Sequence, residues 1–191
     1  MIARARISLG ILAGGQARRL GSVDKAFAEY RGQPLVERSL RAAGNGYAQM
    51  LISHPAQDSR FDAFGLRAVP DLRPAHPGPL AGLEALMQVC TSDWLLTLPV
   101  DLARMPGSAL ASLASIEPVD GSALCDGDGL QPLCALWRVA TVLPVVSRRL
   151  DDGQWSAHGL FETLTMQLHD ISPLRLGNLN SPGDFEDAND D

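Results

Sequence analysis

Short apolar runs alternate along the chain with segments in which apolar residues recur at helical spacing. Apolar runs bounded by turn residues are typical of buried strands. They predict strands at Ile7–Leu12, Gln49–Ser53, Leu66–Val69, Trp94–Leu98, Ser122–Cys125, Leu133–Trp137 and Gln167–Ile171. The helical spacing predicts helices at Pro34–Ala43, Leu80–Cys90, Ser108–Ser115, Thr141–Leu150 and His158–Met166. We expect Pro34 and Pro144 in first helical turns, and Ser181-Pro-Gly-Asp184 at the start of a short final helix.

This alternation of strands and helices predicts one α/β domain over residues 1–191, with three layers: a mainly parallel sheet and helices on both of its faces. In open α/β sheets, ligands bind beyond the carboxyl ends of the strands. Three unusual loops follow predicted strands, at residues 13–24, 70–79 and 99–106. We therefore expect the chemistry of these loops to converge in space.

Composition narrows the classes of function. Of the 191 residues, 46% are hydrophobic and 20% are charged, which is ordinary for a soluble globular protein. The net charge of −6 argues against a general nucleic-acid binder, and no apolar run reaches the roughly 18 residues that cross a membrane. Half of the Lys and Arg residues lie within the first 41 positions, which suits a small polyanionic ligand.

The N-terminus and the cysteines indicate in which cellular compartment the protein works. The basic N-terminus precedes a short apolar run that leads into Gly14-Gly15 and two arginines, so we expect a cytoplasmic protein and not a secreted one. Cys90, Cys125 and Cys134 are odd in number and lack the spacing of metal ligands, and we expect reduced, buried thiols.

The loop after the first predicted strand carries the strongest chemical signal. Gly14 and Gly15 let the backbone approach a ligand and expose amide groups that attract anions. Arg18, Arg19 and Lys25, the only lysine of the chain, add positive charge to the same segment. A compact ammonium reaches a crowded phosphate where a planar guanidinium does not fit. The segment is not a Walker A loop, because no Gly-Lys-Ser/Thr follows, and it is not a dinucleotide-binding fingerprint, because Gly-x-Gly-x-x-Gly is absent.

The same segment carries a family resemblance. Leu12-Ala-Gly-Gly-Gln-Ala-Arg-Arg-Leu-Gly-Ser-Val-Asp-Lys25 resembles the LAGG-x-x-x-RMG-x-x-DK signature of nucleotidyltransferases, and most of all that of the MobA-type molybdenum cofactor guanylyltransferases. The resemblance implies a Rossmann-like nucleotidyltransferase fold in which Leu12, Ala13, Gly14, Gly15 and Lys25 wrap the triphosphate of GTP. Cytidylyl-transferring relatives more often carry Ala-Ala-Gly at the glycine position, so the Gly14-Gly15 pair favours guanine.

Two further motifs match the family in order. Pro70-Asp71 followed by Pro77-Gly-Pro-Leu-Ala-Gly82 is similar to its PD…GPLAG segment, which implies that Asp71 and Gly82 help to hold the nucleoside. The glycine-proline segment is also a plain helix start, and this alternative stays open.

The third motif is an apolar strand that ends in a carboxylate, Asp101, which is costly to bury unless it is paired or bound to a metal. The family has P-x-D here, and its aspartate binds Mg²⁺, a cation that takes one or two carboxylates together with substrate phosphates. The alternative is an acidic residue that stabilises the start of the helix predicted at Ser108–Ser115.

The second half of the chain resembles the part of the family that accepts the pterin. Residues 128–137 are similar to its QPL-x-AL segment, and residues 177–182 to its N-x-N-T/S-P ending. The resemblance divides the domain into a nucleotide-binding part, 1–106, and an acceptor part, 107–191. Asn178 and Asn180 suit a pterin or a phosphate, although asparagine is equally a turn residue.

Two further expectations concern Ser53 and the histidines. Ser53 stands where the family often has an asparagine, so either a backbone group selects guanine or nucleotide preference is looser. The four histidines show no metal spacing, and we expect them on the surface or in loops, with His158 a weak candidate for the pterin side.

The reaction implied by the resemblance joins GTP and molybdopterin to form a guanine dinucleotide cofactor and pyrophosphate. The phosphate of molybdopterin attacks the α-phosphorus, and because this nucleophile is already ionised, no general base is required. Catalysis would rest on alignment and charge stabilisation. Asp101 would hold Mg²⁺, Lys25 and the glycine amides would hold the triphosphate, and Arg19 would neutralise charge on the leaving side.

Three alternatives stay open: cytidylyl transfer from CTP to molybdopterin, nucleotidyl transfer to a sugar or polyol phosphate, and a non-catalytic GTP-binding regulatory protein. Transient docking to proteins that deliver molybdopterin, and to molybdoenzymes that receive the product, is a further expectation. We expect no nucleic-acid or membrane partner.

Overall fold

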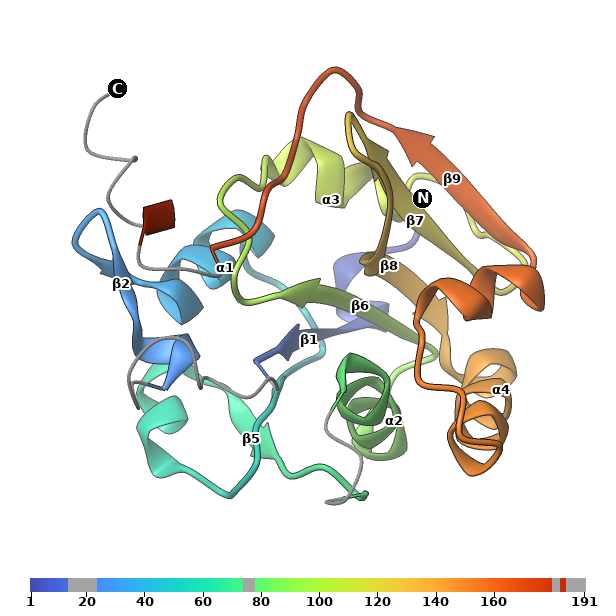
Figure 1. Ribbon diagram of the computed structural model, residues 1–191, viewed down its shortest axis with the longest axis horizontal. Helices are drawn as coiled ribbons and strands as arrows, with labels where there is room; N and C mark the ends of the chain where they lie inside the picture. The colour runs from blue at the N-terminus through green and yellow to red at the C-terminus, as the bar shows by residue number, and fades with distance from the viewer. Residues whose placement is uncertain (14–23, 74–77, 180–182, 185–191) are drawn as a thin grey trace.

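The computed structural model describes residues 1–13, 24–73, 78–179 and 183–184. A seven-stranded sheet has the order β5-β4-β1-β6-β8-β7-β9 (Figure 1). Its strands are β1 (Ile7–Leu12), β4 (Gln49–Ser53), β5 (Arg67–Val69), β6 (Trp94–Pro99), β7 (Gly121–Asp126), β8 (Gly129–Arg138) and β9 (Met166–Asp170). Only β8 among these runs antiparallel to its neighbours. The predicted mainly parallel sheet is confirmed.

Within the described residues, four α-helices and four short 3₁₀ turns join the strands. The helices are α1 (Leu35–Ala43), α2 (Pro79–Val89), α3 (Gly107–Leu113) and α4 (Val139–Asp151). The 3₁₀ turns are η1 (Arg4–Arg6), η2 (Lys25–Phe27), η3 (Ser59–Phe64) and η4 (His158–Glu162). A small two-stranded ribbon, β2 (Glu29–Tyr30) and β3 (Gln33–Pro34), precedes α1.

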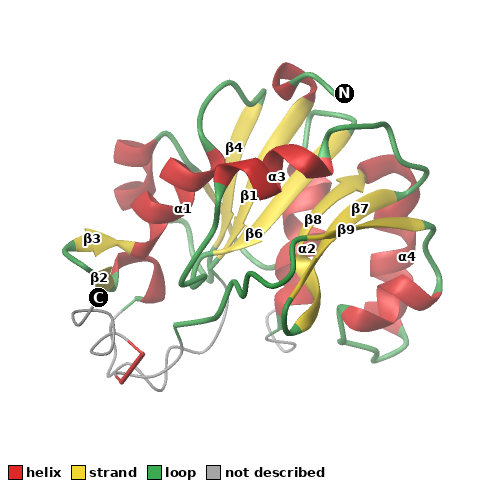
Figure 2. Ribbon diagram, turned by 90° about the horizontal axis from the view of Figure 1, so that it is seen from above, coloured by secondary structure: helices red, strands yellow, loops and turns green. Residues whose placement is uncertain are grey.

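The helices cover both faces of the sheet, as predicted (Figure 2). On one face α2 and α4 pack together, and Leu86 and Val146 belong to the same buried cluster as Trp137 of β8. On the other face α3 contributes Leu110 and α1 contributes Ala43 to a second cluster. Every residue of β1 is buried, because a central parallel strand has helices on both sides.

Two predicted helices differ from the structure. Pro144 lies inside α4 and not in its first turn, because the helix begins at Val139, directly after β8. Proline has no N–H to donate to the preceding turn, so one intrahelical bond is missing there. The segment predicted as a helix at 158–166 is only the short turn η4, and Met166 instead pairs with Gly121 as the first residue of β9. Sheet pairing overrides the helical pattern at that point.

The remaining expectations divide into those the structure addresses and those it does not. All three cysteines are free, and Cys134 is buried while Cys90 and Cys125 are partly buried. Among the described residues, none of the helices is both long and apolar enough to span a bilayer. Ser181 and Pro182, predicted to begin a final helix, lie outside the described residues, whereas Gly183 and Asp184 are helical.

Candidate functional site

The carboxyl ends of three neighbouring parallel strands meet at one edge of the sheet. Leu12, the last residue of β1, is in register with Ser53 at the end of β4 and with Pro99 at the end of β6. Just beyond the end of β6, the Val100 amide donates to the Leu12 carbonyl at 3.1 Å. The described parts of the loops after these strands therefore start side by side, as the alternation of strands and helices predicts.

Lys25 and Asp101 meet at this edge, although 76 positions separate them. The Lys25 ammonium donates to Asp101 Oδ2 at 2.6 Å, and both side chains are largely buried, with 18% and 17% of their surface exposed. Lys25 stands on the turn η2, and Asp101 follows β6. The helix-start alternative for Asp101 does not hold, because α3 begins at Gly107 with Pro106 as its cap and has no acidic residue in its first turn.

Gly82 and Ser53 pack against each other where α2 crosses the end of β4. A Cβ atom on Gly82 would lie 2.7 Å from Ser53 Oγ and 3.1 Å from Ser53 Cβ. A side chain at position 82 would therefore force a shift of α2 or β4. The same motif begins α2, with Gly78 as its cap and Pro79 as its first residue, as the helix-start alternative predicts. Ser53 is fully buried, and its hydroxyl forms no hydrogen bond within the described residues.

Asp71 lies in the loop that follows β5 and is partly buried. Its Oδ1 atom is buried without a hydrogen-bond partner among the described residues. Burial raises the pKa of Asp71, and the neighbouring His54 opposes this shift. A buried carboxylate oxygen without a partner is costly, so Asp71 is suited to bind a hydroxyl group or a cation of a ligand.

An ion-pair network that the sequence did not reveal holds the same loop. Arg73 donates to both oxygens of the buried Glu84, at 2.7 and 3.0 Å, and to Asp151 at 2.6 Å. Ser147 of α4 also donates to Glu84, at 2.7 Å. Burial raises the pKa of Glu84, but the hydrogen bonds from Arg73 and Ser147 outweigh it and lower the pKa. The network fixes the loop that carries Asp71 to α2 and α4.

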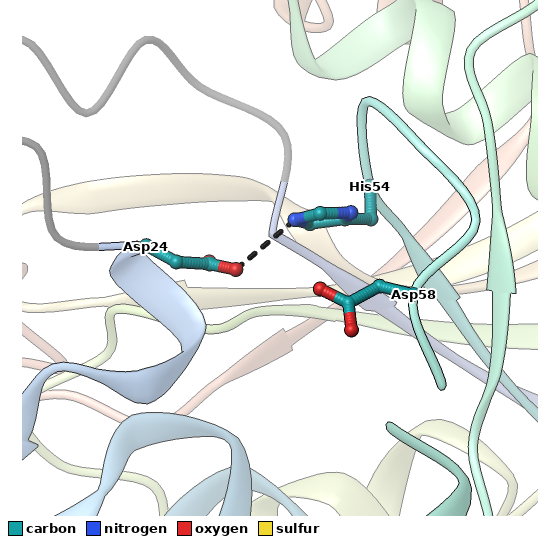
Figure 3. A group of neighbouring side chains, drawn as sticks. All are labelled: Asp24, His54 and Asp58. Atoms are coloured by element: carbon teal, nitrogen blue, oxygen red, sulfur yellow. Dashed lines mark hydrogen bonds and ion pairs between the residues drawn. The ribbon is translucent and has the colours of Figure 1, made fainter. Parts of the chain in front are cut away.

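A cluster of Asp24, His54 and Asp58 lies beside the turn that carries Lys25 (Figure 3). His54 Nε2 lies 3.1 Å from Asp24 Oδ2, and only 15% of the His54 side chain is exposed, so this histidine is a loop residue but not a surface one. Arg60 donates to Asp24 at 2.8 Å and to both oxygens of Asp58. Among the described residues, this group has the geometry of a possible metal site. The Arg60 guanidinium already supplies the positive charge there.

The chain returns to Asp101 near its C-terminus. Leu102 and Asn178 form an isolated antiparallel bridge, and the Leu179 amide donates to the Asp101 carbonyl at 2.8 Å. Asp126, buried at the end of β7, accepts from the Leu176 amide at 2.8 Å and fixes this returning segment. This backbone pairing brings Asn178 close to Asp101 in space. The predicted site residues Gly14, Gly15, Arg19 and Asn180 lie outside the described residues.

The donor set at this edge suits a hard cation. Asp101 offers a carboxylate oxygen beyond the end of β6, whereas Asp71 follows β5, with β4 and β1 between the two strands. Magnesium takes oxygen ligands, usually one or two carboxylates together with phosphates and water. The Asp101 carboxylate thus fits Mg²⁺ bound together with a nucleotide.

Comparison with known proteins identifies relatives of this chain. Residues 9–165 match the model of the MobA-like NTP transferase domain. The chain is 33% identical over 146 residues to the molybdenum cofactor guanylyltransferase of Bordetella pertussis, covering 73% of this chain and 74% of that protein. It is 29% identical over 190 residues to the guanylyltransferase of Aliivibrio fischeri, covering 97% of each.

Among solved structures, the chain resembles molybdopterin-guanine dinucleotide biosynthesis protein A of Archaeoglobus fulgidus. The TM-score is 0.71 at 19% identity, and the match covers 95% of this chain and 96% of that one. At this identity the likeness supports the fold.

Proposed function

Because the chain belongs to the MobA-like NTP transferase family, we propose that it transfers GMP from GTP to molybdopterin and releases pyrophosphate. The chain is a nucleotidyltransferase. The observation that carries the proposal is the pair formed by Lys25 and Asp101 at the carboxyl edge of the sheet, 2.6 Å apart. A cation and an anion placed together there are the groups that a metal-bound triphosphate needs.

The two members of this pair take separate partners in the proposed reaction. The Lys25 ammonium moves from the Asp101 carboxylate to a phosphate oxygen of GTP, and Asp101 is then free to hold Mg²⁺. Bound Mg²⁺ neutralises negative charge on the triphosphate. The amides of Gly14 and Gly15 and the Arg19 side chain hold the remaining phosphate charge. None of these groups removes a proton, because the attacking phosphate is already ionised.

The acceptor is held by the second part of the chain. We assign residues 1–106 to the nucleotide and residues 107–191 to molybdopterin. The backbone bridge between Leu102 and Asn178 supports this division, because it carries the C-terminal segment to the edge where Asp101 lies. Asn178 and Asn180 then bind the pterin or its phosphate. A cytoplasmic location follows for an enzyme that uses GTP, and docking to proteins that deliver molybdopterin or receive the product belongs to the same proposal.

Guanine selection rests on backbone groups near Ser53 in this proposal. The Ser53 side chain is fully buried against Gly82, so its hydroxyl is not presented to a base. Asp71, with its unpartnered carboxylate oxygen, binds the nucleoside through a hydroxyl or an N–H group. This arrangement replaces the asparagine that the family often has at position 53.

Pyrophosphate release tests the function. Purified protein, Mg²⁺ and molybdopterin are incubated with GTP, CTP or ATP in parallel. Release with GTP alone supports guanylyl transfer and base selection without a side-chain amide at Ser53. Release with CTP would assign the chain to cytidylyl transfer. If no nucleotide gives release although GTP binding is measurable, either molybdopterin is not the acceptor or the protein does not catalyse the transfer.

A further inference from the structure

Lys25 stands on a turn that cannot fix its own position. The 3₁₀ turn η2 has only three residues, and it is closed by the Phe27 amide to the Asp24 carbonyl at 2.9 Å and the Ala28 amide to the Lys25 carbonyl at 3.2 Å. Asp24 caps the turn, since its Oδ1 accepts from the Ala26 amide at 3.1 Å. So short a 3₁₀ segment depends on contacts with its surroundings for its orientation.

Arg60 supplies contacts on both sides of Lys25. Its guanidinium donates to Asp24 Oδ2 at 2.8 Å and lies over the ring of Phe27, 4.1 Å from the ring centroid. Asp24 immediately precedes Lys25 and Phe27 follows it by two positions. Phe27 in turn stacks on the buried Phe61, with 5.0 Å between ring centroids.

Hydrogen bonds to Asp58 hold the Arg60 side chain in place. Its Nε atom donates to both oxygens of Asp58, at 3.0 and 2.9 Å, and Asp58 also caps η3 by accepting from the Arg60 amide at 2.9 Å. The planar fork of a guanidinium allows it to bind Asp58, reach Asp24 and cover a ring at once, which an ammonium cannot do. His54 gives Asp24 a second neighbour, at 3.1 Å.

We propose that Arg60 is a positioning residue of the reaction, which holds Asp24 and Phe27 so that the Lys25 ammonium is aimed at the site of the triphosphate. This inference rests on the proposed role of Lys25 as the phosphate-binding cation. Arg60 does not touch the Asp101 carboxylate in the structure; it acts through the turn that carries Lys25. A metal ion at Asp24, His54 and Asp58 is the competing interpretation, but it would have to displace the guanidinium from both carboxylates.

Three variants test the proposal: Arg60→Met, Arg60→Lys and, as a matched control, Arg67→Met. Arg67 is an exposed arginine of the neighbouring strand β5. Each is assayed for GTP affinity, for kcat and KM with GTP, and for its unfolding midpoint. We expect Arg60→Met to weaken GTP affinity and to lower kcat/KM about ten- to a hundredfold, on the scale of a misplacement near 1 Å. Arg60→Lys keeps the charge but loses the fork, so it recovers only a small part, while Arg67→Met matches the wild type.

The decisive measurement repeats Arg60→Met in a Lys25→Ala background. If Arg60 acts through Lys25, the second substitution adds less than about threefold to the loss of GTP affinity, because effects that share one pathway are not additive. An equal loss in both backgrounds, or wild-type GTP affinity in Arg60→Met, would overturn the proposal. Should Arg60→Met unfold, Arg60→Gln replaces it in the same comparison.

The GTP-binding readout separates this proposal from the proposed function. A wild-type protein that binds GTP but does not react with molybdopterin would contradict the acceptor and leave the Arg60 comparison intact. Addition of Mn²⁺ or Zn²⁺ without nucleotide tests the competing interpretation. Tight binding of either ion that is lost in Asp58→Asn would favour a metal at the cluster and overturn the assignment of Arg60.

Discussion

Substitution of Gly82 by alanine probes the contact between α2 and the end of β4. The new Cβ would lie 2.7 Å from Ser53 Oγ, 3.1 Å from Ser53 Cβ and 3.4 Å from Leu12 Cδ2. The hydroxyl can turn away, because it has no partner to lose within the described residues. The Ser53 Cβ cannot, because it is fixed to the backbone of a buried strand. The helix and the strand must therefore separate by a few tenths of an ångström, as about 3.5 Å or more is the favourable carbon–carbon distance.

Two opposing effects set the size of the result. Overpacking of a well-packed interior costs roughly 1–3 kcal/mol. Alanine in place of glycine inside a helix contributes roughly 0.5–1 kcal/mol in the other direction. We expect Gly82→Ala to lower the free energy of unfolding by about 1–2 kcal/mol, because the contact with a strand Cβ cannot be relieved by a rotamer change. The displaced Ser53 and Leu12 belong to the nucleotide edge, so the KM for GTP should rise as well.

Urea unfolding followed by far-ultraviolet circular dichroism measures the first effect. Ser53→Gly removes both atoms of the tightest contacts, so the double variant Ser53→Gly/Gly82→Ala should lose less stability than the sum of the single variants, with a coupling of about 0.5 kcal/mol or more. A Gly82→Ala protein as stable as the wild type, or strict additivity of the pair, would refute the steric reasoning.

The other predictions concern charge. Lys25→Ala is expected to lower turnover with GTP at least about a hundredfold, the scale for loss of one electrostatic stabiliser, as measured by pyrophosphate release. Asp101→Ala is expected to lose turnover to the same extent and to bind Mg²⁺–GTP more weakly in calorimetry; near-normal turnover would exclude the metal role. The lowered pKa of Glu84 gives stability that is present above its unfolded pKa and is lost as pH falls through the folded value. In Arg73→Met, burial and the nearby Asp151 charge raise that pKa more than the remaining Ser147 hydrogen bond lowers it. Unfolding in urea at pH 7 and pH 5 should therefore show a variant that gains stability on acidification relative to the wild type; parallel changes in both proteins would contradict this.

The fold follows from the apolar pattern wherever strands are central. β1 and β4 have the predicted bounds, because both faces of these strands are covered and the apolar runs end where the turns begin. β8 begins at Gly129 and not at Leu133, because residues 129–131 also pair with the end of β7. Leu130 stands there between a glycine and a glutamine, so the sequence shows no apolar run at this point.

Some residues of the site could be selected from the sequence, and others could not. Lys25 and Asp101 could be selected as residues of unusual type at strand ends, and the structure brings them together, while their roles stay a prediction. Arg60 and Arg73 could not be found, since each is one arginine among many and its partners lie on separate segments. Which carboxylate an arginine pairs with is decided by the packing of the loops, and no spacing along the chain records it.

The fate of the phosphates of GTP tests the central claim most directly. GTP labelled at either the α- or the γ-phosphate is incubated with the protein, Mg²⁺ and molybdopterin, and the products are separated. Guanylyl transfer places the α-label in a molybdopterin dinucleotide and the γ-label in pyrophosphate. A γ-label found in inorganic phosphate or on molybdopterin, with the α-label remaining in free nucleotide, would contradict the account.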